Sequence, residues 1–359
     1  MQVKDIELVR NFIRLEQPLK ISFHTFTHYE NYFVRLQTDS GAVGYGEGAP
    51  FAPVTGDSFE EALAELRLKS TLFCRPFANL PEISEVLSGI TARSLRAALD
   101  AALLDAWGKE AGLPVFRLFS ETANSAPNSV TVFLSDSVEE TKKTAADIFA
   151  RYPHLRLLKI KLAGQEDLPR CRAIKSLAPA EMRFMLDGNQ GFAEPETAIE
   201  TILTLTNILG DVLLIEEPCR AKDYESMQRI KRCIGIPLFA DESCLDADDL
   251  PELIKHQACD GINIKLQKCG GILAGLELAR RAQSAGLSVM VGSACETALG
   301  IAASCHFASA IAGLVASDLD MDLDLPDPFG CRPDFRDGRR VPVPMPGLGL
   351  SAQHKAPQT

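Results

Sequence analysis

The sequence lacks the features that mark membrane, secreted or nucleic-acid-binding proteins. It has no run of about 18 apolar residues, so we expect no segment that crosses a membrane. Positive charge is in the minority: 37 Lys and Arg stand against 48 Asp and Glu, and the net charge of −11 argues against binding to nucleic-acid phosphates. The amino-terminal MQVKDIELVR carries charged residues before any apolar run, so we expect no secretion signal.

The ten cysteines form no pairing pattern. They lie far apart without a CxxC pair, whereas the disulfide frameworks of secreted proteins are short and dense in cysteine. We therefore expect reduced, buried cysteines in a cytoplasmic enzyme. A zinc site is not expected, because the only histidines at helical spacing, His24 and His28, lie in a Thr/Phe-rich segment typical of a strand or loop.

The first 125 or so residues predict a small α+β domain. A chain of 359 residues is too long for one ordinary hydrophobic core, unless that core is an α/β barrel. The stretch ENYFVRLQTDSGAVGYGE predicts a β-hairpin, and amphipathic helices are predicted over residues 58–69 and 94–111. An antiparallel sheet followed by helices favours a separate domain.

From about residue 130, short apolar runs alternate with amphipathic helices. The eight runs are TVFL, LRLLKIKL, MRFMLDGN, VLLIEEP, IPLFADES, GINIKL, LSVMVGSA and a last one near residues 315–325. Parallel strands that are buried on both faces give such continuous apolar runs, and their alternation with helices indicates βαβ units. Eight of these units closed on themselves predict an α/β fold of the TIM-barrel type.

The polar residues that end these runs recur at an almost constant step. They follow one another at intervals of 24 to 29 residues, the length of one strand, one helix and two short loops. In chain order, with one glycine among them, they are Lys161, Asp187, Glu216, Asp241, Lys265, Gly292 and Asp318. Each is therefore expected at the carboxyl end of its own strand, where TIM barrels build their active sites.

Three consecutive strands are expected to end in a carboxylate, at Asp187, Glu216 and Asp241. Carboxylates that converge on one point repel one another unless a cation holds them. A ligand set of oxygens without His or Cys selects a hard ion such as Mg²⁺, with Mn²⁺ as a substitute. The alternative is that each acid only caps the helix that follows it.

Lysines flank the three acids in the chain, with Lys161 ending the strand before them and Lys265 the strand after them. Lys159 lies two residues before Lys161 and is expected on the same face of the strand. Two lysines on opposite sides of a metal-bound carboxylate favour a 1,1-proton transfer. One lysine removes the proton α to the carboxylate, the metal stabilises the enediolate, and the other lysine returns a proton. The alternative is that the lysines only form salt bridges.

KIKLAG, LDGNQGF, LIEEP, FADES and NIKLQKCGG, in this order and spacing, resemble the muconate-lactonizing-enzyme subgroup of the enolase superfamily. Members of this superfamily combine a Lys or His base with Mg²⁺. YGEGAPF near the amino terminus and PGLGL near the carboxyl terminus extend the resemblance over nearly the whole chain. It implies a modified TIM barrel, (β/α)₇β, over residues 126–325. An α+β capping domain of residues 1–125 and a returning segment, 326–359, complete the fold.

The resemblance also implies an acid/base pair, three metal ligands and two positions that support these ligands. In that order they are Lys161 and Lys265; Asp187, Glu216 and Asp241; and Asn189 and Glu217.

Within the subgroup, SDLDMDLDLP resembles the DxD signature of the dipeptide epimerases, best matched by Asp318 and Asp320. This pair suits the free ammonium group of a dipeptide, which N-acylated amino acids and muconates lack. Asp322 and Asp324 continue the alternation, so a solvated acidic strand end is the alternative.

Further substrate contacts are implied by VGSACETALG, which resembles the seventh-strand motif of these epimerases. Ser293 and Cys295 would lie against the dipeptide, Cys295 through its backbone. Thr131 and Lys159 are also predicted to contact the substrate.

His24 is the position where the resemblance is incomplete. Members that act on Ala-Glu carry an arginine in a mobile loop after the first strand, and His24 in KISFHTFTHYE takes its place. An imidazole is a weaker carboxylate partner than a guanidinium group, so the second residue of the preferred dipeptide stays open. Phe23 and Phe26 would suit an apolar side chain there, or pack the cap onto the barrel.

The sequence therefore predicts an Mg²⁺-dependent dipeptide epimerase, expected to form a homo-oligomer and to bind no nucleic acid or membrane. On the same scaffold the alternatives are an N-acylamino-acid racemase/o-succinylbenzoate synthase or a muconate cycloisomerase. A non-catalytic binding barrel is the alternative from another class of protein.

Overall fold

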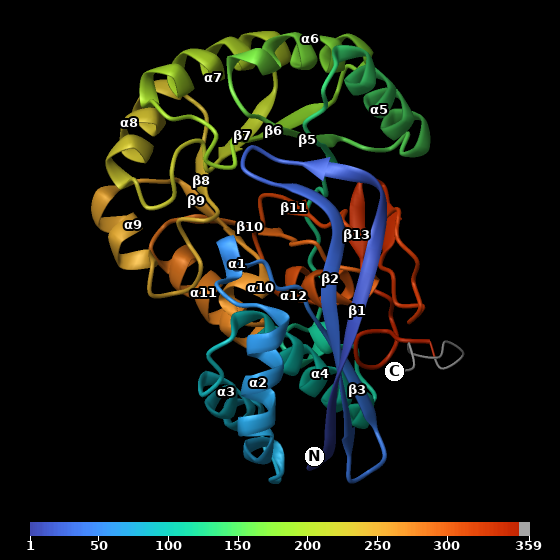
Figure 1. Cartoon of the computed structure of the whole chain (residues 1–359). Coiled ribbons are helices and arrows are strands. Elements are labelled where there is room, and N and C mark those ends of the chain that lie inside the picture. Colours follow the sequence, from blue (N-terminus) through green and yellow to red (C-terminus); the bar gives the residue numbers. More distant parts are fainter. Residues whose placement is uncertain (352–359) are drawn as a thin grey trace.

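The structure is a computed structural model that describes residues 1–351. The last eight residues of the predicted carboxyl-terminal segment, 352–359, lie outside the described residues. Figure 1 shows a parallel barrel with helices on its outside and, against one side of it, a smaller cap of antiparallel strands and helices. No helix in residues 1–351 is both long and apolar enough to cross a membrane.

The cap begins with an antiparallel sheet of β1 (Val3–Lys20), β2 (Thr25–Thr38) and β3 (Val43–Gly48), in that order. The predicted hairpin is confirmed, because β2 and β3 pair across a turn in which Gly41 has a φ of +87°. In Figure 1 the hairpin of β1 and β2 runs from the cap across the barrel. Its tip can therefore form part of a site on the barrel rim.

The helices of the cap are α1 (Ala52–Thr55), α2 (Phe59–Lys69), α3 (Leu80–Ser88) and α4 (Arg93–Ala111), with 3₁₀ turns at Ser70–Phe73 and Val115–Leu118. The two predicted helices are confirmed by α2 and α4. A capping box of Ser58 and Glu61 begins α2, and Gly112 in the left-handed conformation ends α4. Gly46 lets α4 lie directly on β3, because a Cβ at this position would be 2.0 Å from the carbonyl oxygen of Ala98.

An eight-stranded parallel sheet in the described chain confirms the predicted barrel. Its strands are β4 (Val130–Val132), β5 (Leu157–Lys161), β6 (Arg183–Asp187), β7 (Val212–Glu216), β8 (Leu238–Ala240), β9 (Gly261–Ile264), β10 (Ser288–Gly292) and β11 (Ser317–Asp318). The strands pair in chain order, and a bridge from Asn128 to Ser317 joins the two ends of the sheet.

Helices follow the strands and cover the outside of the barrel, as Figure 1 shows. They are α5 (Val138–Arg151), α6 (Leu168–Leu177), α7 (Pro195–Leu209), α8 (Tyr224–Ile234), α9 (Leu250–His256), α10 (Leu266–Cys269), α11 (Ile272–Ser284) and α12 (Ala298–Ala310), with a 3₁₀ turn at Gln165–Asp167 before α6.

The last barrel strand is shorter than the run near residues 315–325 predicts, since β11 consists of Ser317 and Asp318 alone. The chain then turns, and Asp322 accepts two hydrogen bonds of 2.7 Å from Arg340. Arg340 belongs to the hairpin of β12 (Asp334–Arg336) and β13 (Arg339–Val341). Asp322 therefore pairs with this hairpin and does not continue the barrel strand.

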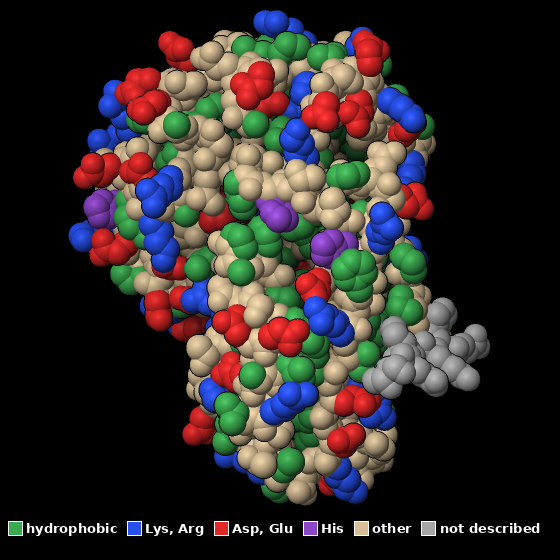
Figure 2. Space-filling model, in the orientation of Figure 1, with side chains coloured by type: hydrophobic (Ala, Val, Ile, Leu, Met, Phe, Trp, Pro, Cys, Tyr) green, Lys and Arg blue, Asp and Glu red, His purple; other side chains and the backbone are tan. Residues whose placement is uncertain are grey.

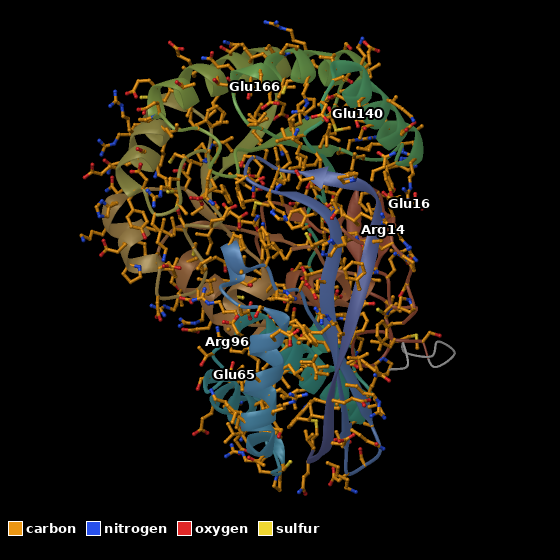
Figure 3. The ribbon with its side chains drawn as sticks, in the orientation of Figure 1. Arg14, Glu16, Glu65, Arg96, Glu140 and Glu166 are labelled. Carbon is orange, nitrogen blue, oxygen red and sulfur yellow. The ribbon has the colours of Figure 1, made fainter. Side chains whose placement is uncertain are left out.

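The carboxyl-terminal segment returns to the cap, where the backbone N–H of Leu348 donates to Asp105 on α4 at 2.8 Å. Arg96 on the same helix, labelled in Figure 3, donates to the carbonyl oxygen of Cys269 in the barrel at 2.8 Å. Glu65 on α2 accepts hydrogen bonds from the backbone N–H groups of Thr91 and Ala92, just before α4. The helix α4 thus joins the cap, the barrel and the returning chain.

Inside the barrel, an apolar layer lies below a charged layer. Side chains alternate along a strand, so Leu157, Lys159 and Lys161 of β5 point to the same side. Leu157 belongs to an interior cluster with Met185, Leu214, Phe239, Met290 and Ala316. The charged side chains at the carboxyl end therefore stand on a packed apolar floor.

Candidate active site

The three carboxylates predicted as metal ligands converge at the carboxyl end of the barrel. Asp187 and Glu216 end β6 and β7, and Asp241 directly follows β8. One carboxylate oxygen of each lies within 4.8 Å of the others, and all three side chains are fully buried. They do not cap the following helices α7, α8 and α9, whose N-cap residues are Glu194, Asp223 and Asp249.

The two lysines predicted as the acid/base pair lie at opposite ends of this carboxylate group. Lys161 Nζ is 2.7 Å from Asp187 Oδ2, and Lys265 Nζ is 2.7 Å from Asp241 Oδ2. Both lysines line one cavity at the mouth of the barrel. A group held in this cavity could therefore be approached by an amine from either side.

Two further lysines lie deeper than the acid/base pair. Lys159 was predicted to contact substrate, but it is fully buried and bridges Asp318 at 2.6 Å, Asp187 at 3.0 Å and Glu216 at 3.1 Å. Lys268, which the sequence analysis missed, lies 2.6 Å from Asp241. The only signal for it in the sequence is its place three residues after Lys265, on the first turn of α10.

Burial favours the neutral form of all three acids, but nearby lysines outweigh it and lower the pKa of Asp187 and Asp241. Glu216 shares Lys159 with two other carboxylates. Its pKa is raised to about 7, first by burial and then by the other carboxylates, against the attraction of Lys159. The three carboxylates could therefore be stabilised by a further positive charge, such as that of a bound cation.

The donor atoms fit a hard divalent cation. Glu216 Oε1 is buried and accepts no hydrogen bond, although Lys159 Nζ lies 3.1 Å away. Among the described residues, Asn189 Oδ1 and Glu242 Oε2 are also buried without a hydrogen-bond partner. Unpaired carboxylate and amide oxygens around three convergent acids are the ligand chemistry that Mg²⁺ prefers.

Asn189 and Glu217, predicted to support the metal ligands, directly contact the strand ends that carry them. The backbone N–H of Asn189 donates to Asp187 Oδ1 at 2.9 Å, and Glu217 Oε2 accepts from the backbone N–H of Asp241 at 2.7 Å. Both have a positive φ, 39° and 30°, a strained conformation for residues other than glycine. Such strain is typical of positions where the surrounding structure fixes a functional geometry.

A cavity of about 360 Å³ lies above these groups, between the barrel rim and the cap. Asp318 and Asp320 line it together. Asp318 Oδ1 accepts from Ser129 Oγ at 2.8 Å, and Asp320 Oδ2 accepts from the backbone N–H of Thr131 at 2.7 Å. Burial, followed by the charge of Asp318, raises the pKa of Asp320 to about 7. This end of the cavity is therefore suited to a cationic group.

The other two acids of SDLDMDLDLP point elsewhere. Asp322 is fully buried against Arg340, and Asp324 is exposed and paired with Arg151. Asp318 itself is 6 % exposed and paired with Lys159, which is not the environment of a solvated strand end. Of the four acids in this segment, Asp318 and Asp320 line the cavity and the other two do not.

The remaining predicted substrate contacts also reach the cavity. Ser293, Cys295 and Thr131 line it. Ser293 Oγ donates to the carbonyl oxygen of Asp318 at 2.8 Å, while the carbonyl oxygen of Cys295 accepts from Asn31 Nδ2 of the cap at 2.7 Å. Burial raises the pKa of the Cys295 thiol to about 12, so the thiol is neutral near pH 7. The ten cysteines are free of disulfide bonds, and seven of them are buried as predicted, but Cys74 and Cys233 are exposed and Cys295 is half-buried.

The cap side of the cavity is aromatic. His24 lies 4.5 Å from Phe26 and 5.0 Å from Phe51, measured between ring centroids, and Phe23 lies 6.3 Å from Phe51. All four line the cavity. In Figure 2 histidine and hydrophobic side chains meet in the middle of this face, between the mixed charges of the barrel and those of the cap.

The loop that carries His24 is shorter than the sequence analysis supposed. Phe26 already belongs to β2, so only residues 21–24 connect the strands of the hairpin. Ser22 Oγ donates to the carbonyl oxygen of Asn189, and the backbone N–H of Leu134 donates to the carbonyl oxygen of Lys20 at 3.1 Å. Backbone pairing within a long hairpin extends the strands into a segment whose local sequence resembles a loop.

Comparison with known protein families gives two matches that cover most of the chain. Residues 4–120 match the mandelate racemase / muconate lactonizing enzyme, N-terminal domain. Residues 140–356 match the enolase C-terminal domain-like family.

Individual relatives cover nearly the whole chain. The sequence is 30% identical to the hydrophobic dipeptide epimerase of Enterococcus faecalis, over 90% of this chain and 92% of that protein. It is 31% identical to the L-Ala-D/L-Glu epimerase of Bacillus subtilis, over 98% and 97%. Among solved structures, the dipeptide epimerase of Enterococcus faecalis V583 complexed with Mg and the dipeptide L-Leu-L-Tyr superposes with a TM-score of 0.90 at 30% identity. This match covers 98% of this chain and 100% of the other.

Proposed function

The chain belongs to the mandelate racemase / muconate lactonizing enzyme family of enolase-like proteins, and on that basis we propose that it is an Mg²⁺-dependent dipeptide epimerase. The observation that carries the proposal is the layout of one cavity. Lys161 and Lys265 approach it from the two ends of a buried carboxylate group, and Asp318 and Asp320 line the same cavity.

Asp187, Glu216 and Asp241 would hold the metal ion. When bound, Mg²⁺ supplies positive charge that stabilises the negative charge developing on a substrate carboxylate as the neighbouring carbon loses its proton. Glu216 Oε1 accepts no hydrogen bond and so remains available to a cation. The pKa of Glu216 is raised first by burial and then by the neighbouring carboxylates, and a bound cation would offset both effects.

Lys161 and Lys265 would exchange the proton on the two faces of the substrate carbon. Burial lowers the proton affinity of Lys265, but its ion pair with Asp241 prevails and raises the pKa of the lysine above its usual value. With Asp241 as a ligand of a cation, its charge would be shared with that cation and would stabilise the protonated form of Lys265 less. A lysine with a lowered pKa can accept a proton near neutral pH.

Asp318 and Asp320 would recognise the free amino terminus of the dipeptide. Two carboxylates at one end of a cavity favour an ammonium group and disfavour a neutral N-acyl group. Thr131 supports this role, since its backbone N–H holds Asp320 and its hydroxyl group lies 3.3 Å from Asp318. The pair distinguishes a dipeptide epimerase from a racemase of N-acylamino acids.

The side chain of the second residue would lie against the cap and be apolar. Phe23, Phe26 and Phe51 line that side of the cavity, and in residues 1–351 no arginine lines it. An acidic side chain would lose water there and gain only the imidazoles of His24 and His28 as weak partners.

A screen of dipeptides for uptake of deuterium from D₂O at the α-carbon tests the proposal directly. It detects proton exchange whichever epimer is the substrate. We expect exchange in the Mg²⁺-loaded protein, fastest with apolar second residues. Exchange confined to N-acylated amino acids, with none on any dipeptide, would contradict the proposal.

A further inference from the structure

The motif YGEGAPF contains Glu47, a buried acid for which the proposed reaction has no use. Glu47 lies on β3 of the cap and is 2 % exposed. Its carboxylate accepts hydrogen bonds from Thr297 N (2.9 Å), Thr297 Oγ1 (2.6 Å) and Gly300 N (2.8 Å), at the start of the barrel helix α12. Since Thr297 is the N-cap residue of α12, an acid of the cap completes the amino end of a barrel helix.

Asn31 extends this contact to the wall of the cavity. Its Nδ2 lies 2.6 Å from Glu47 Oε1 and 2.7 Å from the carbonyl oxygen of Cys295, and it donates to both. A side-chain amide has two N–H groups, so both acceptors can be satisfied at once. Cys295 belongs to the turn of residues 293–296, which joins β10 to the N-cap of α12 and lines the cavity.

Gln267 fastens the same cap strand to the other end of this turn. Its Nε2 donates to the carbonyl oxygen of Glu47 at 3.1 Å and to Glu296 Oε1 at 2.9 Å, and its Oε1 accepts from the backbone N–H of Ala49 at 3.0 Å. The turn of residues 293–296 is thus linked to the cap at Cys295 through Asn31, and at Glu296 through Gln267 of the barrel.

We propose that Glu47 is a positioning residue for substrate binding, which holds the turn of residues 293–296 where it meets the dipeptide. It acts through Asn31 and the amino end of α12. The inference rests on the proposed function for the identity of the ligand. The hydrogen bonds of Glu47 reach the turn and α12 rather than the lysines and acids of the barrel, so its loss affects binding more than proton transfer.

Asp100 offers a matched control. It is also a fully buried acid of the cap, on α4, and it accepts hydrogen bonds from the backbone N–H groups of Ile272 (2.6 Å) and Leu273 (3.3 Å) at the start of α11. Both acids therefore join the cap to the amino end of a barrel helix. The helix held by Glu47 follows a turn that lines the cavity, whereas the helix held by Asp100 follows the pair Gly270 and Gly271.

The test compares Glu47→Gln with Asp100→Asn in the full-length, Mg²⁺-loaded protein. Glu47→Gln weakens several hydrogen bonds to the carboxylate at once, so we expect it to raise KM roughly tenfold and to change kcat less than about threefold. Asp100→Asn should lower the midpoint of thermal unfolding about as much as Glu47→Gln does. Its KM should stay within about twofold of the wild-type value. A KM that is unchanged in Glu47→Gln, or raised equally in Asp100→Asn, would overturn the proposal.

A second variant covers the case in which Glu47→Gln does not fold. Thr297→Val removes the hydroxyl group that donates to Glu47 and accepts from the backbone N–H of Leu299, and it keeps the size of the side chain. We expect about a threefold rise in KM. Backbone hydrogen exchange over residues 293–300 gives a readout without turnover. It should be faster in Thr297→Val and Glu47→Gln but not in Asp100→Asn, and equal rates in all three would overturn the inference. If the wild type exchanges no α-proton on any dipeptide, the proposed function fails separately.

Discussion

The two walls of the cavity are built differently. On the barrel wall, charged side chains are buried and paired with one another, as in Lys161 with Asp187 and Lys265 with Asp241, both at 2.7 Å. The cap wall is made of aromatic rings, and Phe23 and His24 are exposed. A buried charge network tolerates little change, because removing one member leaves its partner unpaired. An exposed aromatic wall can change with little cost. Under the proposed function, the barrel wall would carry proton transfer and recognition of the amino terminus, and the cap wall would select the second residue.

The largest effect is expected on the barrel wall. Asp187→Asn, Glu216→Gln and Asp241→Asn should each lower α-proton exchange on the order of 10³-fold, because a metal ion supplies several kcal/mol of charge stabilisation. Exchange measured with and without Mg²⁺ after dialysis against a chelator checks this. Asp223→Asn, at the N-cap of α8, is the control and should leave the rate unchanged. Full exchange in thoroughly chelated protein would contradict the metal assignment.

A smaller effect is expected where the two walls meet. Asp320→Asn should lower kcat/KM for dipeptides roughly 30-fold, about 2 kcal/mol, because the substrate ammonium loses a charged partner. Asp320 is a better position for this substitution than Asp318, because the loss of Asp318 would also leave Lys159 without its partner at 2.6 Å. Exchange on an N-acylated amino acid serves as the comparison. An equal loss of kcat/KM on both substrates would show that Asp320 does not recognise the ammonium group.

A substitution in the cap wall should change which dipeptide is preferred rather than the rate of proton transfer. His24→Arg should shift preference towards dipeptides ending in Glu or Asp. A guanidinium–carboxylate pair is worth on the order of 1–3 kcal/mol, a change of roughly 5- to 150-fold. Relative kcat/KM values across a dipeptide panel measure the shift, with His256→Arg on α9 as the control. An unchanged profile would place His24 outside the contacts of the substrate.

The smallest expected effect is a dependence on pH. The pKa of Asp320 is raised to about 7, so this carboxyl gains a proton as the pH falls through that value and can no longer pair with an ammonium group. KM should therefore rise as pH falls, by about fourfold between pH 8 and pH 6.5, since only the ionised form binds well. Asp320→Asn should remove this dependence. A KM that falls with decreasing pH would contradict the role of Asp320.

The barrel wall could be predicted from the sequence and much of the cap wall could not. The constant step that places Lys161, Asp187 and Glu216 at their strand ends follows from the repeated βαβ unit, which fixes where each strand stops. Sequence alone did not show that Lys159 lies beneath the cavity, because its partner Asp318 is 159 residues away.

Partners that are distant in the sequence also explain why other features could not be predicted. The buried role of Glu47 depends on Thr297, 250 residues later in the chain. On the barrel side, Asp322 pairs with Arg340, 18 residues later, only in the folded chain. Phe26 lies in β2 because the hairpin pairs it with Leu19. Contacts of this kind leave no local pattern, so the sequence motifs indicated the reaction more clearly than the substrate.

The central claim is that Lys161 and Lys265 each serve one face of the substrate, and α-proton exchange in D₂O with Lys161→Ala and Lys265→Ala tests it most directly. Both variants should lose epimerisation in both directions. Each should keep slow exchange, with retention of configuration, on one epimer only, and the two variants should act on opposite epimers. The contrary result is one variant that is inactive on both epimers and another that is nearly normal, which would indicate a one-base reaction and contradict the epimerase account.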